Sequence, residues 1–186
     1  MKELIAQYLV QEKMEEEDTD ILHRKLFNVN MRLYNSNVEY KNVIKKVIKY
    51  MREVICTEFD DYAELRGLSG ANVGIPLNII AIKVKNKKGL PPNLKVASQY
   101  TIVFFFLNPK IVKHSRKTTI IESNCGSINL STSVKVVRYD WIELESYDLS
   151  GKKQLERYNK PLSLTIQHEV DHNAGVLITD KIVKEV

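Results

Sequence analysis

The sequence predicts a single-domain α+β fold in which mixed or antiparallel sheets pack around a late helix that carries a metal-binding motif. Three observations favour this fold. A helix pattern covers residues 38–60, a block of strand-like segments lies between residues 79 and 158, and a second helix pattern follows Pro161. Sheet segments followed by a late helix are typical of α+β domains. We expect residues 1–186 to form one domain, with 1–35 as an N-terminal arm or short helix and 36–184 as the core.

Length and composition are consistent with a globular chain. The chain has 186 residues, of which 44% are hydrophobic and 27% are charged, so global disorder is excluded. A chain of this length buries enough surface to fold without a disulfide or a structural metal. Any bound metal is therefore expected to serve chemistry.

Charge and targeting signals limit the partners. The net charge of +5 comes from scattered basic residues, so it permits contact with RNA-rich particles, does not require it, and predicts no DNA partner. Acidic residues at positions 15–18 argue against a signal peptide, and the apolar run 102–107 is too short to span a membrane. Cys56 and Cys125 have no disulfide-framework spacing. These features predict a cytoplasmic setting without a membrane partner.

The first helix is amphipathic. Between residues 38 and 60, apolar side chains recur every three or four positions, as on one face of a helix: Val43, Ile44, Val47, Ile48, Met51, Val54, Ile55 and Phe59. Cys56 lies beside this stripe, and we expect it to be a small buried hydrophobic residue. Gly67, Gly70 and Gly74 then end the pattern and allow the backbone to approach a ligand closely.

Strand-like segments fill the middle of the chain. Ile79–Val84 and Tyr100–Leu107 are apolar enough to be buried strands, with a surface loop at 85–99 between them. Ile142–Ser146 alternates apolar with acidic side chains, as a half-exposed strand does. The turn at 148–152 then predicts a hairpin whose second strand follows directly.

The late helix carries the main chemical signal. It is expected to run from Pro161 to about Asn173, and it contains His168 and His172 four residues apart with Glu169 between them. At this spacing both imidazoles lie on one helix face and reach the same point. This H-E-x-x-H pattern is typical of proteins in which two histidines bind a metal and the glutamate handles a proton of the attacking water. The alternative is a helix with two surface histidines.

A third metal ligand must come from elsewhere, because catalytic sites of this kind commonly use three protein ligands. Cys125 is the strongest candidate, since it follows the apolar pair Ile120-Ile121 at a point where a strand gives way to a loop. On its own it would be read as a core residue.

Together these motifs resemble the peptide deformylase family. Its third motif, H-E-x-D-H, is complete at residues 168–172, and Gly175 to Asp180 is similar to the family's G-x-L-F-x-D. Leu107 to Ile111 is similar to its L-x-N-P-x-I strand. The resemblance covers about residues 38–184. The loop at 85–99 and the lack of a long C-terminal helix resemble the form common in Gram-positive bacteria and their wall-less relatives.

Two motifs depart from the family pattern. In the first, G-φ-G-φ-A-A-P-Q, Asn72 stands in place of the glutamine, and Arg66 replaces an apolar residue near the methionine pocket. In the second, E-G-C-L-S, the cysteine is retained as Cys125, but the leucine position is Gly126 and the nearest acid is Glu122.

The resemblance implies a metal-dependent hydrolase that removes the formyl group from formyl-methionine of nascent polypeptides. It implies one divalent metal held by Cys125, His168 and His172, namely Fe²⁺ in the cell, with Zn²⁺ or Ni²⁺ as substitutes. It also implies N-formylmethionyl peptides as partners, and it is compatible with contact with the ribosome.

The resemblance also assigns roles to single residues. Glu169 would act as general base and then acid, while the Asn72 amide and the Gly126 N–H would hold the oxyanion. Gly67 would pair with the peptide backbone, Arg138 stands where the family has an arginine, and Leu164 would line the methionine pocket. Two alternatives remain open. One is a catalytically impaired deformylase homologue, and the other is a zinc-type metallopeptidase.

Overall fold

The computed structural model describes residues 21–57, 65–85, 101–125 and 132–183. Its main element is a five-stranded sheet of order β1-β2-β3-β6-β7, in which every pairing between named strands is antiparallel. The strands of this sheet are β1 (Leu65–Ser69), β2 (Ile79–Val84), β3 (Ile102–His114), β6 (Trp141–Tyr147) and β7 (Lys153–Asn159). A separate two-stranded ribbon pairs β4 (Thr118–Ser123) with β5 (Val134–Tyr139).

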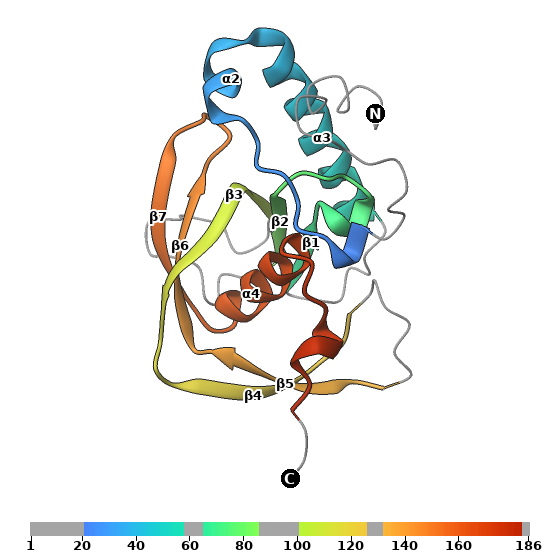
Figure 1. Cartoon of the computed structure of the whole chain (residues 1–186), viewed down its shortest axis with the longest axis vertical. Coiled ribbons are helices and arrows are strands. Elements are labelled where there is room, and N and C mark those ends of the chain that lie inside the picture. Colours follow the sequence, from blue (N-terminus) through green and yellow to red (C-terminus); the bar gives the residue numbers. More distant parts are fainter. Residues whose placement is uncertain (1–20, 58–64, 86–100, 126–131, 184–186) are drawn as a thin grey trace.

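Helices complete the fold. The α-helices are α2 (Met31–Ser36), α3 (Val38–Thr57) and α4 (Leu162–Asn173). Short 3₁₀ turns are η1 (Ile21–His23), η2 (Ala71–Val73) and η3 (Ile178–Lys181). Figure 1 shows α4 in the middle of the molecule, between the large sheet and the β4–β5 ribbon. Within the described residues, no helix has the length and apolar character needed to cross a bilayer.

Helices α3 and α4 cover opposite faces of the sheet. Strand β2 is buried along its whole length, and its side chains alternate between two apolar clusters. Ile79 and Ala81 pack in the cluster that contains the apolar stripe of α3. Ile80 and Ile82 pack in the cluster that contains Ile166 of α4. The sheet is therefore the middle layer, and it holds α4 in a fixed position.

The segment before α2 also packs into the core. Leu26 and Val29 are buried, and the Leu26 N–H donates to the Asn173 carbonyl at the end of α4 (2.9 Å). Gly175 follows that helix end with φ of 75°, and a Cβ there would lie 2.9 Å from the backbone of Arg24. A glycine is needed at this position, both for the left-handed conformation and for the close chain contact.

Most of the predicted elements are present. The α3 helix, β2, the β6–β7 hairpin and α4 match the expected segments, and β3 continues to His114 beyond the expected end. Residues 86–100 of the predicted loop lie outside the described residues. The expectation that Cys56 is buried was wrong. It lies on the exposed side of the last turn of α3, just beyond the apolar stripe.

Candidate metal centre

Helix α4 is fixed in place by a buried glutamine. The Gln167 Oε1 accepts from the Tyr139 N–H (2.9 Å), and its Nε2 donates to the carbonyls of Tyr139 (2.9 Å) and Ser163 (3.0 Å). Together with the buried apolar residues Leu162 and Ile166, this contact sets the rotation of the helix. The face with the two histidines is consequently directed toward Cys125.

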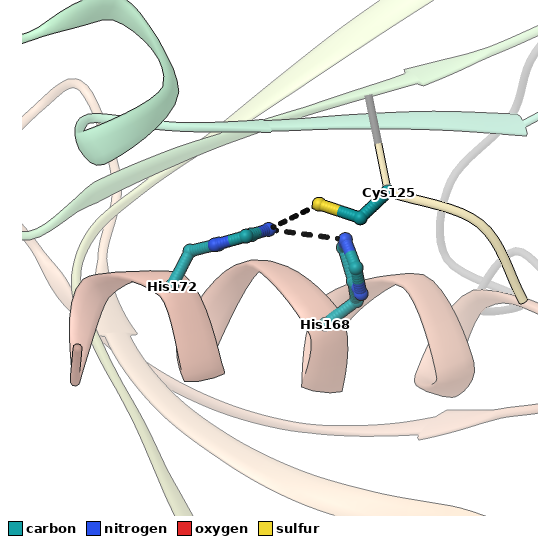
Figure 2. Close-up of side chains that lie close together, drawn as sticks. All are labelled: Cys125, His168 and His172. Atoms are coloured by element: carbon teal, nitrogen blue, oxygen red, sulfur yellow. Dashed lines mark hydrogen bonds between the residues drawn. The ribbon is translucent and has the colours of Figure 1, made fainter. Parts of the chain in front are cut away.

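Three ligand atoms converge at one point. Figure 2 shows His168 and His172 projecting from α4 toward Cys125, which approaches from the chain that follows β4. The His172 Nε2 lies 3.2 Å from the Cys125 Sγ and 3.2 Å from the His168 Nε2. All three ligand atoms lie within 4.8 Å of one another, and Cys125 and His172 are buried.

This geometry fits a metal ion. Tetrahedral zinc with ordinary Zn–S and Zn–N bond lengths places its ligand atoms roughly 3.3–3.6 Å apart, close to the two observed separations of 3.2 Å. Burial, together with the neighbouring His172 and Arg138, lowers the pKa of His168 to about 3. Burial also lowers the pKa of His172. Both imidazoles are therefore neutral at neutral pH, which is the state that ligates a metal.

Glu169 is next to His168 on α4 and is buried. Its Oε2 has no hydrogen-bond partner among the described residues. Burial raises the pKa of Glu169 to about 8, against the opposing effect of the Arg138 charge. Burying a carboxylate oxygen without a hydrogen-bond partner costs stability, and groups with perturbed pKa values of this kind cluster at functional sites. A pKa near neutrality suits a group that both accepts and returns a proton.

Gly67 allows β1 to approach α4 closely. A Cβ built on Gly67 would collide with the Glu169 carboxylate. No other residue type would fit there without displacing Glu169 or the strand. The glycine therefore has a steric role that the sequence did not reveal, beside the backbone pairing expected of it.

Arg138 forms a partly buried ion pair with helix α4. Its guanidinium contacts the Asp171 carboxylate, whose other oxygen accepts from Lys181 (2.7 Å). Asp171 belongs to α4, Arg138 to β5 and Lys181 to η3, so the three charges join the helix, the ribbon and the C-terminal turn. Arg138 also lines the cleft described below.

Asn72 is part of a small hydrogen-bonded turn. Its Oδ1 accepts from both the N–H and the hydroxyl of Ser69 (2.6 Å each), and its own N–H donates to that hydroxyl (3.3 Å). Because a backbone N–H can only donate, the carbonyl end of the amide faces Ser69. The Nδ2 end is the donor end of this amide.

A cleft of about 960 Å³ runs over these groups. The predicted site residues that line it include Gly67, Asn72, Cys125, Arg138 and Leu164, together with the three functional groups of α4: His168, Glu169 and His172. Gly126 lies outside the described residues. The structure thus places all the described residues that were predicted as site residues along one cleft.

Sequence reasoning missed Ser69, Gln167 and Lys181. Gln167 carries a weak signal, since a polar side chain stands on the buried side of an amphipathic helix. Ser69 and Lys181 carry none, because their partners depend on how distant segments pack.

Fold and site together define a class of α+β proteins in which one helix supplies two histidines and a preceding loop supplies a thiol to a common metal-binding point. A sequence profile described as polypeptide deformylase matches residues 13–186. The chain belongs to the polypeptide deformylase family.

Curated relatives of this chain include peptide deformylases of streptococci. A peptide deformylase of Streptococcus thermophilus is 30% identical over 124 residues, which cover 64% of this chain and 59% of that protein. One from Streptococcus pyogenes is 28% identical over 162 residues, which cover 83% of this chain and 76% of that protein. The chain spans about 59% of the length of the S. thermophilus relative.

Solved structures share the fold. A class I type b peptide deformylase from Acinetobacter baumannii superposes with a TM-score of 0.66 at 21% identity, covering 88% of this chain and 93% of that one. Peptide deformylase from Plasmodium falciparum superposes with a TM-score of 0.66 at 26% identity, covering 92% of this chain and 87% of that one.

Proposed function

We propose that this chain removes the formyl group from the N-formylmethionine of nascent polypeptides by hydrolysis of the formamide bond. The observation that carries this proposal is the convergence of Cys125, His168 and His172 beside the buried Glu169 in a protein of the deformylase family. The cleft over these groups is large enough for a short peptide.

Cys125, His168 and His172 would hold one divalent cation, with Fe²⁺ as the cellular metal and Zn²⁺ or Ni²⁺ as substitutes in a purified sample. Such a cation supplies a Lewis acid that lowers the pKa of water toward neutrality. A thiolate ligand requires a reducing setting, and this supports a cytoplasmic location, where nascent chains and ribosomes are found.

Glu169 would move the proton. It accepts a proton from the attacking water as the oxygen bonds to the formyl carbon. It then delivers this proton to the methionine nitrogen as the C–N bond breaks, so formic acid and a free amine leave the site, and the formic acid releases its remaining proton to give formate. General acid–base work of this kind typically contributes 10²–10⁴-fold in rate.

The remaining residues would bind substrate. The Nδ2 of Asn72 and the Gly126 N–H would donate to the developing oxyanion. The Gly67 backbone would pair with the peptide by strand addition, and Leu164 would line the methionine pocket. Arg138 would hold α4 in register through Asp171 while it lines the same cleft.

The substrate class has support from a structural neighbour. A class I type b peptide deformylase from A. baumannii, 21% identical to this chain, has been solved with Met-Ala-Ser bound. Met-Ala-Ser is the product expected from formyl-Met-Ala-Ser, so this peptide is a direct probe of the proposed reaction.

The test incubates Fe²⁺-reconstituted protein with formyl-Met-Ala-Ser under anaerobic conditions and measures formate and free amines. We expect one formate and one methionyl amine per turnover, and no reaction from Cys125→Ser. Cleavage of the Met–Ala bond would support the metallopeptidase alternative. Metal-replete protein without turnover would support the impaired homologue. Either result would contradict the proposal.

A further inference from the structure

A cationic side chain stands at the substrate edge of the sheet. Arg66 is the second residue of β1, which forms the sheet edge and has β2 as its neighbour among the described strands. The Arg66 side chain is exposed and lines the cleft. No ion pair joins it to a residue in the part of the chain that the structure describes.

Strand geometry places Arg66 on the face opposite the metal centre. The Cβ direction of Gly67 leads to Glu169 of α4, and neighbouring residues of a strand point to opposite faces. Arg66 therefore shares its face with Leu68, which packs in the α3 cluster.

The same alternation applies to a peptide added to the open edge of β1. A methionine side chain directed at Leu164 on α4 places the side chain of the following residue on the Arg66 face. The second residue of the peptide is therefore the one whose side chain can meet the guanidinium.

The exposed guanidinium of Arg66 favours an anion at this point. Lys83 of β2 lies opposite Arg66 in the strand register, but its side chain is buried and has an interaction partner of its own. A carboxylate on the peptide would therefore pair with Arg66 at the open edge of β1.

We propose that Arg66 is a specificity-determining residue that favours peptides with Asp or Glu directly after the methionine. This inference rests on the proposed function for the position of the peptide. An exposed ion pair is worth little, so the expected preference over an uncharged residue is about two- to fivefold in affinity. It should shrink as ionic strength rises.

Calorimetric binding of product peptides to the Zn²⁺-loaded protein tests this without requiring turnover. Met-Glu-Ser, Met-Gln-Ser and Met-Lys-Ser, all amidated at the C-terminus, differ in the charge of the second side chain. For the unaltered protein, we expect the affinity to fall in that order. Arg66→Gln should abolish the difference in affinity between the Glu and Gln peptides. Arg66→Glu should reverse the order of the Glu and Lys peptides. The matched control is Arg32→Gln, which removes an exposed arginine from α2, and we expect it to retain the order.

Equal binding of the Glu and Gln peptides to the unaltered protein would overturn the role of Arg66, as would a Glu preference that survives in Arg66→Gln. The formate assay is read separately. The expected binding order without formate release would refute the proposed function and support the contact at Arg66. Formate release without the expected binding order would support the proposed function and refute the contact at Arg66.

Discussion

At the scale of single residues, the turn around Asn72 bears on the oxyanion contact that we propose for this side chain. Asparagine is one methylene shorter than the glutamine of the family motif, and its Oδ1 is held by two hydrogen bonds from Ser69. These hydrogen bonds fix the orientation of the amide, so the position of Nδ2 is set before a substrate binds. In the proposed reaction Ser69 would act through Asn72, as a positioning residue.

A double-mutant cycle tests this coupling. Asn72→Ala removes a donor to the oxyanion and should lower kcat by ~10²–10³ with unchanged metal content. Ser69→Ala should lower kcat by a smaller factor and have no further effect in the Asn72→Ala background, because its role passes through the amide. Steady-state kinetics and elemental analysis measure both. Additive losses, or an Asn72→Ala enzyme as fast as the parent, would refute the coupling.

At the scale of elements, Asn108 joins the segment before α2 to the sheet. It lies at an irregularity of β3 between Leu107 and Lys110, with φ of 53°. Its Oδ1 accepts from the Val29 N–H (2.7 Å), and its Nδ2 donates to the Val29 carbonyl (2.8 Å). One side chain thus satisfies both backbone groups of a buried residue.

Two substitutions separate the hydrogen bonds from the backbone conformation. Asn108→Gly tolerates the positive φ but leaves Val29 unpaired, so we expect a loss of about 1–3 kcal/mol in the free energy of unfolding. Asn108→Ala should lose about 1 kcal/mol more, because a Cβ is disfavoured at this φ. Urea unfolding measures both. An alanine variant at least as stable as the glycine variant would contradict the backbone argument.

The sequence predicts those features of the fold and the site that depend on residues close together in the chain. The His168–His172 pair and the α3 stripe repeat with the helical period, so they are predictable. Strand β1 was missed because Gly67 and Gly70 make it look like a break, and the glycine serves the close approach to Glu169. The prediction that Cys56 is buried was wrong because a shift of one position along a helix turns a side chain by about 100°, from the buried face to the exposed face. Partners such as Ser69 with Asn72 depend on side-chain geometry that spacing does not encode.

At the scale of the whole molecule, the described elements share continuous apolar clusters on both faces of one sheet. We propose that the chain unfolds as one domain, with the metal adding stability to a fold that does not depend on it. The apolar core is built from α3, α4 and β2, and none of its largest side chains is a metal ligand.

Metal removal tests this proposal. At a free metal concentration 100 times the dissociation constant, binding contributes about 2.7 kcal/mol. For a chain of this size, this corresponds to a Tm shift of roughly 5–11 °C. Chelation should lower Tm by that amount and leave a single cooperative transition, while Cys125→Ser should abolish most of the shift. Calorimetry that shows an unfolded apoprotein, or two separate transitions, would contradict the proposal.

The central claim is that Glu169 moves the proton in a deformylation at the Cys125–His168–His172 centre. The most direct measurement compares formate release from formyl-Met-Ala-Ser by the unaltered protein and by Glu169→Gln, at metal contents matched by elemental analysis. We predict that the variant retains the metal, since Glu169 is not among the three converging ligands, and loses ~10²–10⁴ in rate. Formate release at an unchanged rate from the metal-replete variant would contradict the account.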